Sequence, residues 1–106
     1  MRVGMFSNMK AKLLLRERQS LPETAFIGVV FIGVVIWHVP KPVSGSGHDD
    51  KYSLVLVVEG VCVVRYDNEL GDHKHVADRE AAYRFIDLAA LQTDFWNDVE
   101  SWRAAQ

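Results

Sequence analysis

The residues between positions 25 and 37 constrain the fold more than any other part of the chain. They form an unbroken run of 13 apolar or glycine residues, in which the pentapeptide Phe-Ile-Gly-Val-Val occurs twice in tandem. The run is shorter than the roughly 18–20 residues that a membrane-spanning helix needs. Its β-branched residues favour a buried strand, so we expect a protein that does not enter the membrane.

The tandem repeat conflicts with the geometry of a regular strand. Thirteen extended residues would measure about 43 Å, more than twice the usual strand length. An insertion of five residues also exchanges the two faces of a strand, because side chains alternate with a period of two. We therefore expect the run to bend or to extend beyond the sheet, with Gly28 or Gly33 absorbing the mismatch as a β-bulge.

Length and composition predict one globular domain. The chain has 106 residues, of which 49% are hydrophobic and 25% are charged, and this size allows one hydrophobic core. The single cysteine, Cys62, lies in an apolar run, which favours a buried thiol in a cytoplasmic protein. No apolar segment follows Arg2 within the first nine residues, so we expect no signal peptide.

The charges are distributed unevenly along the chain. The formal net charge of -2 argues against a broad basic surface for nucleic acid. Residues 1–18 nevertheless carry five bases and one acid, whereas residues 67–106 carry four bases and nine acids. A local basic groove is compatible with this distribution.

Several short apolar runs predict an antiparallel meander. Residues 10–19 form a strand with one buried face, and a turn at 20–24 connects it to the long apolar strand. Pro40 ends that strand, and a loop follows at 43–51. The β-branched runs 54–58 and 61–66 form a hairpin around a two-residue Glu59-Gly60 turn, which we expect at the centre of the sheet.

The C-terminal region predicts one long helix. Asp87 is placed to cap its N-terminus, and a continuous apolar stripe follows at Leu88, Leu91, Phe95, Val99 and Trp102. The outer face carries Gln92, Asp94, Asn97, Asp98 and Arg103. The predicted fold is therefore α+β: an antiparallel meander of about four strands, packed by one long C-terminal helix.

The densest group of polar residues lies between 66 and 75. If residues 73–75 are extended, His73 and His75 point to one face and Lys74 to the other. Two imidazoles on one face can bind a metal ion or divide the work of acid and base.

A metal site would need a third ligand, from Asp67, Asp72 or His48. No cysteine cluster and no His-Glu-x-x-His spacing supports it, so we expect no metal and no other cofactor. Cleavage of a phosphodiester without metal needs a base, an acid and a cation, and His73, His75 and Lys74 supply these groups. The alternative is that these residues only form turns and an exposed loop.

A second candidate site is the segment Tyr83-Arg84-Phe85, with Arg79 nearby. Arginine can hold phosphate, and an aromatic ring can stack on a base. The simpler interpretation is that Tyr83 and Phe85 anchor the chain in the core before the helix.

Four ordered motifs make the chain resemble the TumE family of toxin–antitoxin proteins, over about residues 9–103. The motifs are WHVPKPV at 37–43, KYSL at 51–54, RYDNE at 65–69 with GDHKH at 71–75, and YRF at 83–85. The resemblance divides the chain into an N-terminal extension at 1–8 and one toxin domain at 9–106. It implies a small prokaryotic toxin of a type II pair, inhibited by a helix-turn-helix antitoxin and acting on RNA.

Within that resemblance, the expected activity is metal-independent RNA cleavage in the cytoplasm. His73 and His75 would act as general acid and base, with Lys74 as the catalytic cation. Contacts with the RNA substrate are expected from Arg79, Arg84 and Tyr83, and positioning of the catalytic groups from Tyr66, Asp67 and Asp72.

The sequence also departs from the family pattern. The repeated pentapeptide lengthens one strand, only Leu70 separates Glu69 from Gly71, and Ala82 stands where a proline is expected before Tyr83. Without that proline, residues 78–83 could form a short helix. Two alternatives to a ribonuclease follow: a non-enzymatic module that binds a partner through its polar loop and acidic helix, or an inactive remnant of a toxin.

Overall fold

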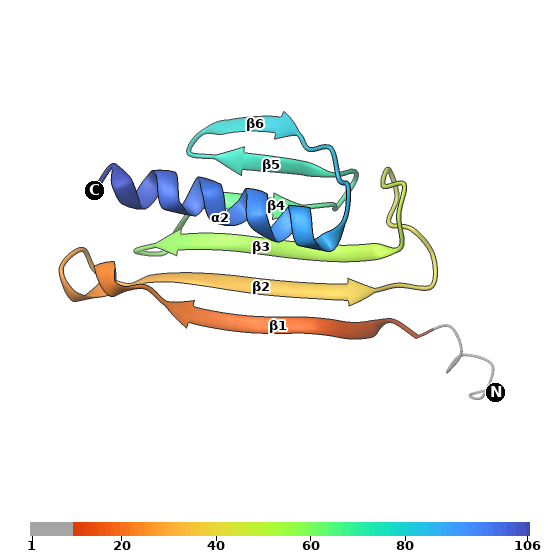
Figure 1. Ribbon diagram of the computed structural model, residues 1–106, viewed down its shortest axis with the longest axis horizontal. Coiled ribbons are helices and arrows are strands. Elements are labelled where there is room, and N and C mark those ends of the chain that lie inside the picture. The colour runs from red at the N-terminus through yellow and green to blue at the C-terminus, as the bar shows by residue number, and fades with distance from the viewer. Residues whose placement is uncertain (1–9) are drawn as a thin grey trace.

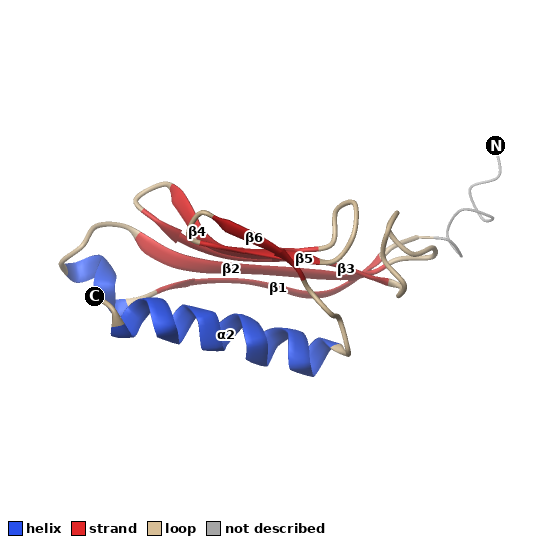
Figure 2. Ribbon diagram, turned by 90° about the horizontal axis from the view of Figure 1, so that it is seen from above, coloured by secondary structure: helices blue, strands red, loops and turns tan. Residues whose placement is uncertain are grey.

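The computed structural model describes residues 10–106 as a six-stranded antiparallel sheet with one long helix on one face (Figures 1 and 2). The expected extension at 1–8 lies outside the described residues. The strands follow one another across the sheet in chain order. The elements are β1 (Lys12–Ser20), the 3₁₀ helix η1 (Pro22–Ala25), β2 (Val30–His38), β3 (Asp50–Val58), β4 (Val61–Asp67), β5 (His73–Val76), β6 (Arg79–Ala82) and α2 (Leu88–Ala104).

The α+β class, the meander and the C-terminal helix are confirmed, but the expected number of strands was wrong. The two additional strands, β5 and β6, form a hairpin that continues the sheet beyond β4. Ala77 has φ 57° in the tight turn between them. Residues 79–82 form β6, so the short helix considered for 78–83 is absent. Each strand has only four residues, too few for the alternation of apolar and polar side chains to identify it.

The two copies of the pentapeptide have different structures. The strand β2 begins at Val30, the last residue of the first copy, so the preceding four residues lie in the turn after η1. Gly28 adopts φ +126° there, and a Cβ atom at this position would overlap the side chain of Glu59. The run therefore extends beyond the sheet, as expected. The β-bulge expected at Gly28 or Gly33 is wrong, because Gly28 lies in the turn before β2 and Gly33 pairs regularly with Arg18 and Val55.

Side-chain contacts fix the position at which β2 begins. The hydroxyl of Thr24 donates to the carbonyl of Val30 at 2.8 Å and accepts from its amide at 3.0 Å. Glu23 connects the same turn to α2 through a 2.8 Å ion pair with Nε of Arg103. The hydrogen bond within this ion pair lowers the pKa of the Glu23 carboxyl. Arg103 therefore contacts the turn before β2 and does not belong to a solvated outer face of the helix, as we had expected.

The core lies between α2 and the sheet. Asp87 caps α2 as predicted, by accepting a 2.7 Å hydrogen bond from the amide of Ala90. Leu91, Phe95 and Val99 of the predicted stripe are fully buried. They pack against alternate residues of the three central strands, namely Val30, Ile32, Val34, Ile36, Tyr52, Leu54, Leu56, Val64 and Tyr66.

The opposite face of the sheet has no covering element among residues 10–106 (Figure 2). The edge strand β1 also lies away from α2 (Figure 1), and only Leu15 in it is half-buried. The expectation of a buried face in this strand was therefore wrong, and Leu13 and Leu14 are 42% and 45% exposed. Cys62 is half-buried rather than buried. None of the described helices has the length and apolarity needed to cross a membrane.

The different structures of the two repeats predict different effects of the same substitution. Val29 and Val34 occupy equivalent positions in the two copies, but they are 52% and 3% exposed. We expect Val34→Ala to lower the free energy of unfolding by about 1.5–3 kcal/mol, because it removes buried methyl groups and leaves a cavity. Val29→Ala should change it by less than about 0.5 kcal/mol. Urea unfolding measures both, and equal effects would contradict this assignment of the repeats.

Candidate functional site

The short strand β5 separates the three predicted catalytic residues. His73 and His75 lie on the open face of the sheet, with their ring centroids 5.4 Å apart, which confirms that they share a face. Lys74 points to the opposite face, where its Nζ lies 3.3 Å from the carboxylate of Asp98 in α2. Strand alternation therefore prevents Lys74 from acting beside the histidines.

His73 is held by contacts at both ring nitrogens. Its Nδ1 lies 2.8 Å from the carbonyl oxygen of Gly71, to which it donates. Its Nε2 lies 3.2 Å from Oδ1 of Asp67, the residue paired with it across β4 and β5. Because both nitrogens face acceptors, the protonated imidazole has a partner for each of its N–H groups. Asp67 thus lies where a positioning residue was expected.

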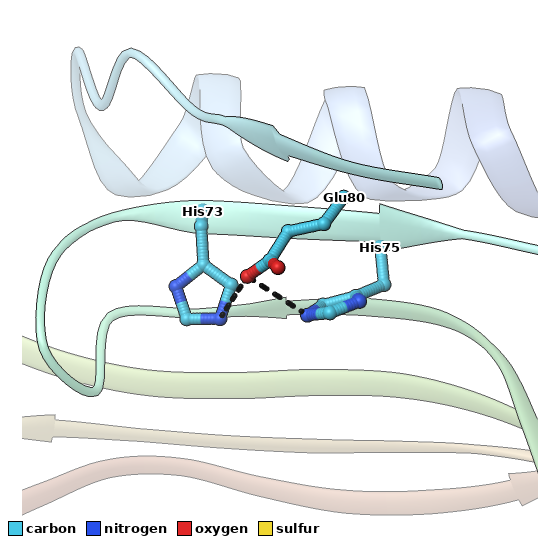
Figure 3. Close-up of side chains that lie close together, drawn as sticks. All are labelled: His73, His75 and Glu80. Atoms are coloured by element: carbon cyan, nitrogen blue, oxygen red, sulfur yellow. Dashed lines mark ion pairs between the residues drawn. The ribbon is translucent and has the colours of Figure 1, made fainter. Parts of the chain in front are cut away.

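Glu80 joins the two histidines from the neighbouring strand β6 (Figure 3). Its Oε2 lies 3.3 Å from Nε2 of His75 and 3.9 Å from Nε2 of His73. No pattern in the sequence indicated this contact, because residues 78–83 were not expected to form a strand. Among the third ligands considered earlier, only Asp67 lies at this cluster.

Arg65 is a cation on the histidine face, in the strand next to the two histidines, and it was not among the predicted site residues. It pairs with His75 in the register of β4 and β5, so both side chains project from the same face. Its Nη1 lies 4.0 Å from Oδ2 of Asp67, and its side chain is 47% exposed. Arg65 and His73 both line a depression of about 420 Å³ beside the loop before β5. The sequence signal that could have identified Arg65 is its position two residues before Asp67 in one strand, because residues two apart lie on the same face.

The predicted positioning residue Tyr66 belongs to a different cluster, on the α2 side of the sheet. Its hydroxyl donates to Oδ2 of Asp98 at 2.5 Å, and the hydroxyl of Tyr83 donates to Oδ2 of Asp94 at 2.6 Å. The rings of Tyr66 and Tyr83 meet edge to face, with centroids 5.0 Å apart. Tyr83 therefore anchors the chain before α2, and the two aspartates are not the free outer face that we expected.

Asp72 organises a third cluster, which joins two loops. Its carboxylate accepts from the hydroxyl of Tyr52 at 2.8 Å, from Ser46 at 3.1 Å, and from Nε2 of His48 at 2.9 Å. Nδ1 of His48 accepts from the amide of Asp50 at 3.2 Å, so the proton of this ring is on Nε2. Ser46, His48 and Asp72 consequently lack a free base and do not form a nucleophilic triad.

The remaining predicted substrate contacts lie away from the histidines. Arg79 pairs with Val76 at the start of β6, which places its side chain on the α2 side of the sheet. Arg84 is exposed in the link between β6 and α2. Neither arginine reaches the cluster around His73.

The geometry of the open face permits acid–base chemistry. It combines two half-buried imidazoles with an exposed guanidinium group and with two carboxylates that orient the imidazoles. Proton transfer to and from a bound phosphodiester requires these groups.

The chain matches a known family over almost its whole length. The model of the family described as Toxin TumE matches residues 10–103, nearly the whole chain. Comparisons with curated proteins and with solved structures gave no match.

The tyrosines generate a prediction for alkaline pH. The chain has three tyrosines, Tyr52, Tyr66 and Tyr83. Burial is the main cause that raises the pKa of each above the usual 10, and a hydrogen bond to an aspartate is the second. Because the unfolded chain ionises more readily, this contribution to stability is complete below pH 10 and decreases as the pH rises above it. We expect tyrosinate absorbance to appear only with the loss of the circular-dichroism signal. A tyrosine that ionises near pH 10 in the folded protein would contradict the hydrogen-bonded arrangement.

Proposed function

Because the chain belongs to the TumE toxin family, we propose that it is the toxin of a type II toxin–antitoxin pair and that it cleaves RNA without a metal ion. The observation that carries this proposal is the pair His73 and His75 on a sheet face that no element of residues 10–106 covers, with Arg65 beside them. These groups provide the acid, the base and the cation that transesterification of RNA requires.

The hydrogen bonds support different roles for the two histidines. His73 is suited to act as the general acid, because its cationic form can donate from Nδ1 to the carbonyl of Gly71 and from Nε2 to Asp67. Glu80 faces Nε2 of His75 and favours the tautomer with a proton there. Nδ1 of His75, which has no hydrogen bond within residues 10–106, is then free to accept the proton of a ribose 2′-hydroxyl.

The reaction follows from these roles. His75 removes the 2′-hydroxyl proton, the 2′-oxygen attacks the neighbouring phosphorus, and His73 protonates the leaving 5′-oxygen. Arg65 stabilises the charge that develops on the phosphate, which was the role expected of Lys74. The proposal gives Arg79, Arg84 and Tyr83 no contact with the scissile phosphate.

The open face supports RNA as the substrate. The strand register aligns one row of residues across all six strands, and this row leads from a cation in β1 to the site: Arg18, Gly33, Val55, Arg65, His75 and Glu80. At about 4.8 Å per strand, Arg18 lies roughly 19 Å from His75. The guanidinium of Arg18 lies 3.7 Å from the centroid of the Phe31 ring. Cations and aromatic rings on a sheet are typical of single-stranded RNA binding.

Two observations weigh against the alternative functions. The acidic face required for a binding module is partly occupied, because Asp94 and Asp98 bind Tyr83, Tyr66 and Lys74. The repeat that suggests an inactive remnant is accommodated in a turn, and the pairing of β2 with β3 is regular over its whole length. The partner in this proposal is a helix-turn-helix antitoxin that inhibits the toxin in the cytoplasm.

Expression of the full chain in a bacterial host tests the proposal. We expect the parent to stop growth and to fragment cellular RNA, whereas the His73→Ala, His75→Ala double variant should do neither. The purified parent should cleave RNA, but not the 2′-deoxy analogue, in the presence of a chelator. Loss of acid and base should slow cleavage at least about 100-fold. His38→Ala is the matched control, because His38 is an exposed histidine of β2 outside the site.

Two results would reject the ribonuclease. One is a purified protein that cleaves no RNA together with a double variant as toxic as the parent. The other is a double variant that loses toxicity and antitoxin binding in parallel, which indicates a binding module.

A further inference from the structure

The contacts around Glu80 place several metal-binding atoms close to one point. One ligand atom each from His73, His75 and Glu80 lies within 4.8 Å of the other two. Asp67 adds a fourth donor, 3.2 Å from Nε2 of His73. The group combines two imidazoles with two carboxylates, which is a common donor set for zinc.

The spacing of these atoms fits a tetrahedral ion. Metal–ligand bonds of about 2.0–2.1 Å at tetrahedral angles place neighbouring ligand atoms roughly 3.4 Å apart. The corresponding separations are 3.3 Å for His75 and Glu80, 3.2 Å for His73 and Asp67, and 3.9 Å for His73 and Glu80. The ligand atoms of His73, His75 and Glu80 thus lie near the positions that one ion requires, and the carboxylate of Asp67, which contacts His73, would supply the fourth ligand by turning toward them.

The surroundings of His73 resemble those of a metal ligand. A histidine that binds a metal through one nitrogen usually donates the other N–H to a carbonyl or carboxylate, which fixes the ring. His73 already donates from Nδ1 to the carbonyl of Gly71, which leaves Nε2 directed at the cluster. His75 and Glu80 are directly paired in the β5–β6 hairpin, so their backbones hold them at a fixed separation.

We propose that His73, His75, Glu80 and Asp67 form a binding site for Zn²⁺, and that occupancy of this site switches off RNA cleavage. Two imidazole ligands favour zinc over Mg²⁺ and Ca²⁺, which prefer oxygen ligands alone. The binding site depends only on the geometry, whereas the switch rests on the ribonuclease proposed above.

The switch acts through the protons of the two histidines. A neutral imidazole that binds zinc through Nε2 carries its proton on Nδ1. His75 then has no lone pair with which to accept the 2′-hydroxyl proton. His73, bound through Nε2, has no proton there to give to the leaving oxygen. Zinc thus removes the base and the acid together.

Titration of the tag-free full chain with Zn²⁺ in a calorimeter tests the site, and the visible spectrum of the Co²⁺ form reports its geometry. We expect one ion per chain and tetrahedral Co²⁺ absorption. His75→Ala and Glu80→Gln should each weaken binding at least about tenfold, whereas His38→Ala should bind as the parent does. Glu80 is exposed, so Glu80→Gln remains informative if His75→Ala does not fold. Absence of binding, or equal binding by all the variants, would overturn the site.

The rate of RNA cleavage, measured with chelator and with increasing Zn²⁺, tests the switch. We expect inhibition with a midpoint at the dissociation constant from calorimetry, and the midpoint of Glu80→Gln, which keeps both histidines, should shift with its own affinity. Cleavage that increases with zinc would overturn the switch and the metal independence of the proposed reaction, but not the site. If neither condition gives cleavage, the proposed function and the switch both fail, and calorimetry alone decides the site.

Discussion

The packing of α2 against one face of the sheet determines which side chains of each strand are buried and which stay open to solvent. It buries alternate residues of β2, β3 and β4, and leaves the residues between them on a face that solvent reaches. Since side chains alternate along a strand, each strand contributes to two different environments. In β5 this division sends Lys74 to the carboxylates of α2 and the two histidines to the open face.

Loop contacts hold the site in register with the sheet. Asp72 accepts hydrogen bonds from Ser46, His48 and Tyr52, and so connects the loop after β2 with the residue immediately before β5. Gly45 allows the two loops to approach closely, because it adopts φ +84° and a Cβ atom there would lie 3.1 Å from the backbone of Gly71. The carbonyl of Gly71 in turn orients His73. Asp72 therefore acts on the site indirectly, by placing the segment that holds the histidine.

The sequence predicted the elements whose local signals agree with their packing. Asp87 and the apolar stripe after it identified α2, and Glu59-Gly60 identified the central hairpin, whose turn has φ 49° and 79°. The hairpin of β5 and β6 was missed because each strand is short and mostly polar. Its stability comes from backbone pairing with β4, which no local pattern reveals. Glu80 was missed for the same reason. Arg65 required the register between β4 and β5, which no local pattern specifies.

The chemical ends of the RNA fragments show whether the two histidines on the open face cleave RNA through its own 2′-hydroxyl. Attack by the 2′-oxygen leaves a 2′,3′-cyclic phosphate on one fragment and a 5′-hydroxyl on the other. We expect these ends from the purified full chain in the presence of a chelator. Fragments with a 5′-phosphate and a 3′-hydroxyl would show that water attacks the phosphorus instead, and would contradict the roles assigned to His73 and His75.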